Sequence, residues 1–159
     1  MTKTLCKSRK HDVLLLLGPG QNLLDHRRKI KNDLVCKYGY NRRDIIIMED
    51  IRAKRDDTGI DEKFERILKY YDPMLVIALF HRKARMDGVI FEIGCLCGLY
   101  GTRNIGQRLR FLTESGYNFK AMTPYITTLF PKIHSVPFDD SKEYAKPAKL
   151  IDVFVATKC

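Results

Sequence analysis

The chain has 159 residues, of which 45% are apolar and 30% are charged, with 29 lysines and arginines against 19 acidic residues. This length and composition exclude a disordered or fibrous protein and suit one domain with its own hydrophobic core. The net charge of +10 implies attraction to phosphate groups, and it leaves open whether nucleic acid, an anionic membrane or a phosphorylated small molecule carries them.

The first eleven residues are polar and basic, and we expect them to form an N-terminal arm, residues 1–11. They do not have the apolar stretch of a signal peptide, and the apolar run at 13–17 is too short to span a bilayer. The five cysteines are an odd number, which favours reduced thiols. We therefore expect a cytoplasmic protein, not associated with a membrane, with a single α/β domain over residues 12–159.

Short, continuous apolar runs bounded by turn signals predict strands buried on both faces. Apolar residues spaced three or four apart predict helices between these strands and at the end of the chain, and the apolar segment after Gly88 is a further helix. Residues 113–132 have no clear assignment. The predicted strands are 12–17, 44–48, 74–80, 109–112 and 133–138, and the other helical patterns lie between Leu23 and Val35, between Phe64 and Tyr71, and between Tyr144 and Phe154.

Three local patterns predict how the helices end and pack. Gly39 is placed to end the first helix in a left-handed conformation. Thr58, three residues before Asp61, matches a capping box at the start of the second helix. Gly94 and Gly98 lie one turn apart, so we expect them to let their helix pack close to the sheet.

Strands that alternate with helices predict an open, mostly parallel sheet of about five strands, flavodoxin-like or Rossmann-like, with helices on both faces. In such sheets ligands bind at the carboxyl ends of the strands. The candidate site is therefore made by three loops, at 18–22, 49–50 and 81–88.

Glu92 is the one charged residue between Gly88 and Thr102. A buried carboxylate without a partner costs several kcal/mol, so its place in an apolar helix favours a role in a site. The structural alternative is that Glu92 satisfies free amides near the helix N-terminus, where the macrodipole favours it by about 0.3–1 kcal/mol. A capping box would need serine or threonine where Val89 stands, which weakens that alternative.

The pattern Asp-Gly-x-x-x-Glu-x-Gly at Asp87, Gly88, Glu92 and Gly94 resembles the nucleoside 2-deoxyribosyltransferase family and the related TIR-like domains. The preceding apolar strand and the Gly-Pro loop after the first strand add to the likeness, which follows the order of elements over residues 1–115. The resemblance implies that Glu92 attacks, or stabilises positive charge at, the anomeric carbon of an N-glycosidic bond. It also implies that Asp87 holds the sugar hydroxyls.

The three loops supply the candidate substrate-binding residues. Glycines let the backbone approach a ligand, amide side chains can hydrogen-bond a sugar or base, and a basic loop can hold a phosphate, which favours nucleotides, including NAD. A plain turn is the alternative for the Gly-Pro-Gly stretch. The substrate-binding candidates are Gly18, Pro19, Gly20, Gln21, Asn22, Asp50, His81, Arg82, Arg85 and Gly88, with Lys83 in the same basic loop and Tyr117, Asn118, Thr123 and Tyr125 as further candidates in the unassigned connection.

The sequence leaves three functions to be tested. The first is a nucleoside- or nucleotide-binding protein that cleaves or transfers an N-glycosidic bond, and the second is a non-catalytic nucleotide-sensing or protein-interaction module of the same fold. The third is a basic nucleic-acid-binding protein, which is less favoured because no aromatic residues interleave the basic clusters. We expect no required cofactor and no metal, with NAD or a nucleotide as substrate or ligand, and a homo-oligomer as a further partner that the resemblance implies.

Overall fold

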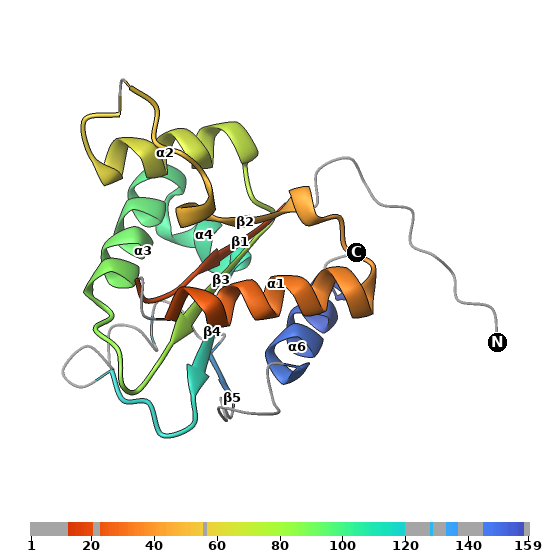
Figure 1. Cartoon of the computed structure of the whole chain (residues 1–159). Helices are drawn as coiled ribbons and strands as arrows, with labels where there is room; N and C mark the ends of the chain where they lie inside the picture. Colours follow the sequence, from red (N-terminus) through yellow and green to blue (C-terminus); the bar gives the residue numbers. More distant parts are fainter. Residues whose placement is uncertain are drawn as a thin grey trace.

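A computed structural model describes residues 13–20, 23–55, 57–119, 128, 133–136 and 145–157. Five parallel strands form one sheet in the order β2-β1-β3-β4-β5 (Figure 1). The open parallel α/β sheet is thus confirmed, and its strand order is that of flavodoxin-like folds. The predicted basic arm lies outside the described residues. The strands are β1 (Leu14–Leu17), β2 (Ile45–Ile47), β3 (Leu75–Phe80), β4 (Leu109–Glu114) and β5 (Ile133–Val136).

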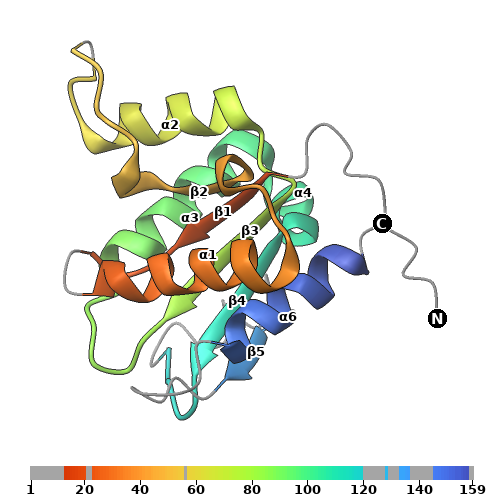
Figure 2. The same ribbon diagram turned by 45° about the vertical axis from the view of Figure 1, so that its right-hand side comes forward.

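Helices cover both faces of the sheet (Figures 1 and 2). Helices α1 and α6 pack on one face, while α2, α3 and α4 pack on the other. Successive residues of β1 point to opposite layers, so Leu14 and Leu16 meet α1 and α6, whereas Leu15 and Leu17 face the other three helices. The helices are α1 (Leu24–Tyr38), α2 (Ile60–Tyr71), α3 (Asp87–Tyr100), α4 (Thr102–Arg108) and α6 (Ala145–Ala156), with 3-10 turns η2 (Arg42–Asp44) and η3 (Met48–Asp50).

Glycines with positive φ end two of these helices. Gly39 has φ of 75° and its amide donates to the carbonyl of Leu34, which confirms the predicted end of α1. Gly101 has φ of 76° and separates α3 from α4. Helix α4 was not predicted, because its seven residues are mostly polar and Ile105 is the one residue that it buries.

The start of α2 differs from the predicted capping box. Its N-cap is Gly59, which makes no side-chain cap, so the pairing of Thr58 with Asp61 is wrong. The amide of Thr58 instead donates to the carboxylate of Glu62, at 2.6 Å. Glu62, one position further along, therefore makes the hydrogen bond that the sequence pattern predicted for Asp61.

The outward side of α3 carries the two glycines that were expected to face the sheet. Gly94 and Gly98 are exposed, and a Cβ at either would meet no neighbouring atom within 4 Å, so that prediction is wrong. Phe91, which is 55% exposed, precedes Gly94 by three residues and Gly98 by seven, and Leu99 of the same helix is 42% exposed. The residues of α3 that pack inward are Val89, Ile93 and Leu96. A helix that is apolar nearly all round has no periodicity to show which side is buried.

The lengths of the helices and the state of three thiols are also defined for the described residues. Their helices include none that combines the length and the apolar character needed to cross a bilayer. Cys36 is an exposed free thiol, and Cys95 and Cys97 are half-buried free thiols on α3. None of these three thiols forms a disulfide bond, in agreement with the reduced thiols expected from the odd number of cysteines.

Candidate active site

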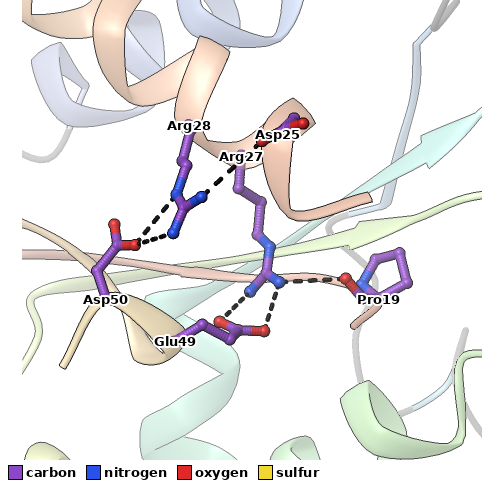
Figure 3. Close-up of polar contacts among 6 residues, drawn as sticks. All are labelled: Pro19, Asp25, Arg27, Arg28, Glu49 and Asp50. Carbon is purple, nitrogen blue, oxygen red and sulfur yellow. Dashed lines mark hydrogen bonds and ion pairs between the residues drawn. The ribbon is translucent and has the colours of Figure 1, made fainter. Parts of the chain in front are cut away.

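A buried arginine ties together the carboxyl ends of β1 and β2. Arg27 of α1 is 2% exposed, and its guanidinium donates to the two carboxylate oxygens of Glu49 at 2.8 and 2.5 Å (Figure 3). A third bond runs from Arg27 to the carbonyl of Pro19, at 3.1 Å. The bidentate geometry is the strongest that an arginine and a carboxylate form. Arg27 therefore holds the loop after β1 against η3.

Gly18 provides the space that Arg27 occupies. A Cβ on Gly18 would lie 2.8 Å from Cδ and 3.0 Å from Nε of Arg27. The sequence led us to expect that this glycine lets the backbone approach a ligand. In the structure its missing side chain makes room for a protein side chain instead.

Gly18→Ala is therefore expected to lower the free energy of unfolding by about 1–3 kcal/mol, since the three hydrogen bonds of Arg27 resist the shift that a methyl group demands. Gly20→Ala is the matched control, because a Cβ there meets no atom within 4 Å. Urea unfolding of the two variants measures the difference. Equal losses in both would contradict the assigned role of Gly18.

Asp50 also pairs with α1. Arg28 donates to Oδ1 of Asp50 from Nη2 at 2.7 Å and from Nε at 3.1 Å (Figure 3). The two side chains are 47% and 32% exposed, so water competes with the pair and its net contribution is small. Asp50 is thus a partly exposed carboxylate at the end of β2, and its predicted role in binding a ligand stays a prediction.

Glu92 lines a small cavity at the same edge of the sheet. The cavity has a volume of about 60 Å³, and Met48, Phe64, Gly88 and Phe91 form its other walls. The pKa of Glu92 is raised from 4.5 to about 7, chiefly by burial and then by the negative charge of Glu49, while the positive charge of Arg27 opposes both. No residue of the described part of the chain hydrogen-bonds the Glu92 side chain, so no backbone amide of that part seals the carboxyl group.

His81 is a buried residue at the start of the loop after β3 and does not line the Glu92 cavity. It is 5% exposed, and its ring centroid is 5.1 Å from that of His26. Burial lowers its pKa to about 4, with His26 and Arg27 acting in the same direction and Glu114 opposing them. A buried, neutral imidazole brings no positive charge at neutral pH, so His81 adds none to the predicted phosphate-binding group.

A larger cleft, with a volume of about 540 Å³, opens on the other side of the start of α3. The loop after β3 and the turn after β4 form its walls. Asp87 lines this cleft, whereas Glu92 lines the small cavity, and the two hollows share no lining residue. The two acidic residues of the sequence motif therefore face different spaces. The cleft residues with polar or aromatic side chains are Arg82, Arg85, Asp87, Tyr117, Asn118 and Phe119.

The structure divides the predicted site residues into two groups. Gly18, Pro19 and Asp50 lie near the Arg27–Glu49 pair. The charges of that pair act on the pKa of Glu92, and Gly88 lines the small cavity together with Glu92. Gly20 is exposed beside them. Arg82, Arg85, Asp87, Tyr117 and Asn118 belong to the larger cleft, and Lys83 does not line it. Gln21, Asn22, Thr123 and Tyr125 lie outside the described residues.

Sequence reasoning missed the pairing of Arg27 with Glu49. One signal was available, because Arg27 precedes Ile30 by three residues and Leu34 by seven, which places it on the buried face of α1. Its partner was not deducible, since Glu49 lies 22 residues further along the chain.

No cluster of three or more histidine, cysteine or acidic side chains that could hold a metal occurs in the described ranges. The small cavity thus has the carboxyl group of Glu92, on which the charges of Glu49 and Arg27 act, and the larger cleft has arginines with aromatic rings. No model of a protein family, no curated protein and no solved structure matches the chain, so the case for a function depends on these two hollows.

Proposed function

We propose that the chain binds a nucleoside or nucleotide at the carboxyl edge of the sheet and cleaves or transfers its N-glycosidic bond, with Glu92 as nucleophile or oxocarbenium stabiliser. One observation carries the proposal. Glu92 is the one charged side chain between Gly88 and Thr102, and it lines a small cavity together with Met48, which follows β2, and Gly88 of the helix that follows β3. Between β2 and β3 in the sheet lies β1, and the strand order reverses between β1 and β3. This switch point is where open α/β sheets bind ligands.

The chemistry suits the carboxyl group of Glu92. Breaking a glycosidic C–N bond creates positive charge at the anomeric carbon, which a nearby carboxylate stabilises or traps. In the covalent route an oxygen of Glu92 bonds to this carbon as the C–N electron pair leaves with the base, and water or a second base then releases the sugar. Arg27 holds Glu49 away from the reaction as an ion pair. The pKa of about 7 leaves roughly half of Glu92 ionised at neutral pH.

Chromatographic assay of NAD, nucleosides and nucleoside monophosphates tests this function. We expect the wild-type chain to release a free base, and Glu92→Gln to lower that rate by at least about a hundredfold without loss of fold. Because the ionised form of Glu92 is the reactive one, the wild-type rate should rise as the pH passes through about 7. The absence of turnover of every substrate by the wild-type chain would exclude the enzymatic function.

A second candidate is a non-catalytic nucleotide-sensing or protein-interaction module. It is favoured by the larger cleft, which has arginines and aromatic rings but does not include Glu92. Stabilisation of the chain by a nucleotide in a thermal-shift assay, without release of base, would select this function.

A further inference from the structure

The larger cleft combines positive charge with aromatic rings. Its volume of about 540 Å³ lies within the usual range for small-molecule sites. We propose that this arginine–aromatic cleft binds a nucleoside phosphate, with the phosphate on Arg82 and Arg85 and the base against Tyr117 and Phe119. The site does not use Glu92, so it goes beyond the proposed reaction and stands without it.

Arg82 is the better placed of the two arginines. Its backbone amide donates to the carboxylate of Glu114 at 2.6 Å, which anchors the start of the loop to the end of β4. Its guanidinium is exposed and forms no ion pair with any described residue. A Cβ on Gly116 would lie 3.7 Å from Nη1 of Arg82, so the guanidinium lies against the turn that forms one wall of the cleft. An anchored arginine without a carboxylate partner has its donors free for an anion.

Arg85 has a partner that a phosphate can replace. Nε of Arg85 is 3.5 Å from Oδ2 of Asp87, and the two side chains are 94% and 82% exposed. Such an exposed pair contributes little, because water and salt screen it. A phosphate has more charge than a carboxylate and accepts two parallel hydrogen bonds from a guanidinium. With Arg82 and Arg85 against Asp87, the charged side chains that line the cleft sum to a positive charge.

The aromatic wall is held rigidly from behind. The rings of Tyr117 and Phe119 are 5.0 Å apart, and they lie 5.4 and 5.0 Å from the fully buried ring of Phe80. Rings that are already fixed lose little conformational freedom when a ligand binds. A planar base stacks on such rings whatever its identity. The combination of aromatic rings and an anion site therefore matches a nucleoside phosphate better than it matches a bare anion.

Calorimetric titration of the full chain with AMP, adenosine and ribose 5-phosphate tests the proposal. We expect AMP to bind more tightly than either fragment. The double variant Arg82→Ala/Arg85→Ala should weaken AMP on the order of tenfold or more and leave adenosine unchanged. Lys83→Ala is the matched control, because Lys83 is an exposed cation of the same loop that does not line the cleft. Tyr117→Leu should weaken AMP and adenosine together but not ribose 5-phosphate, and melting curves verify that each variant is folded.

Two results with the wild-type chain would overturn the proposal: no binding of AMP, or equal affinity for AMP and adenosine. Two results with variants would also overturn it: a loss of AMP affinity in Lys83→Ala as large as in the double variant, or loss of AMP binding in Glu92→Gln. The last result would place the ligand in the small cavity instead. Failure of the proposed reaction gives a different result, because base release would then be absent while Glu92→Gln and the wild-type chain bind AMP equally.

Discussion

Arg27→Met is expected to lower the free energy of unfolding by about 3 kcal/mol, because it leaves the carboxylate of Glu49 without its partner in a partly buried place. Burial decides the size of the effect. Arg27 is 2% exposed and Glu49 is 29% exposed, so water reaches one side of the pair only. The loss therefore belongs at the lower end of the range measured for broken buried ion pairs.

Arg28→Met is the matched control. Arg28 is the next residue along the same helix and pairs with Asp50, the residue after Glu49, but that pair is exposed to solvent. Its loss should cost less than about 1 kcal/mol. Urea unfolding of both variants measures the difference, and similar losses would show that burial does not distinguish the two pairs.

The double variant Arg27→Met/Glu49→Leu separates the cost of the unpaired charge from the cost of lost packing. Replacing both members of a buried pair with apolar residues is often close to neutral, so we expect it to recover a large part of the stability that Arg27→Met loses. A double variant as unstable as Arg27→Met would show that packing around Gly18 and Pro19 sets the cost, not the unpaired Glu49.

Glu92 and His81 are expected to give opposite dependences of stability on pH. The pKa of Glu92 rises from 4.5 to about 7 on folding, so the folded chain binds that proton more tightly and loses stability as the pH rises through this window. The pKa of His81 falls from 6.5 to about 4, so the chain loses stability as the pH falls through that window. Each shift corresponds to about 3 kcal/mol.

These two contributions cancel between about pH 4.5 and pH 6.5, where the windows overlap. Glu92→Gln removes the contribution of Glu92. The stability of this variant should therefore rise with pH from about 4 to 6.5 and exceed that of the wild-type chain at pH 8 by up to about 3 kcal/mol. His81→Leu removes the contribution of His81, so the stability of this variant should fall as the pH rises from about 4.5 to 7.

Urea unfolding at pH values from 4 to 8.5 measures these slopes. The comparison uses slopes because each substitution also changes packing by an amount that does not vary with pH. Identical slopes in Glu92→Gln and the wild-type chain would contradict the burial of the Glu92 carboxyl. The charges that face these groups, Glu49 and Arg27 near Glu92, and His26, Glu114 and Arg27 near His81, are unchanged in both variants.

The sheet was predictable because its signals are local. A strand buried on both faces must be apolar at every position, as 14–17 and 75–80 are, and this requirement is visible in the residues themselves. The left-handed Gly39 at the end of α1 is equally local. The placement of the three loops along one edge of the sheet followed as well, because the carboxyl ends of parallel strands share that edge.

Contacts between distant segments decided the rest. The Arg27–Glu49 pair joins α1 to η3, and no local pattern names the partner of a buried charge. The side of α3 that packs inward was ambiguous, since an apolar helix offers the sheet several equivalent faces. Asp87 and Glu92, read as one motif, are five positions apart on α3, and the packing of that helix turns them toward separate hollows. The sequence by itself thus determined the sheet and the edge that bears the site, whereas the tertiary structure decided which side chains meet there, because those meetings depend on packing between elements.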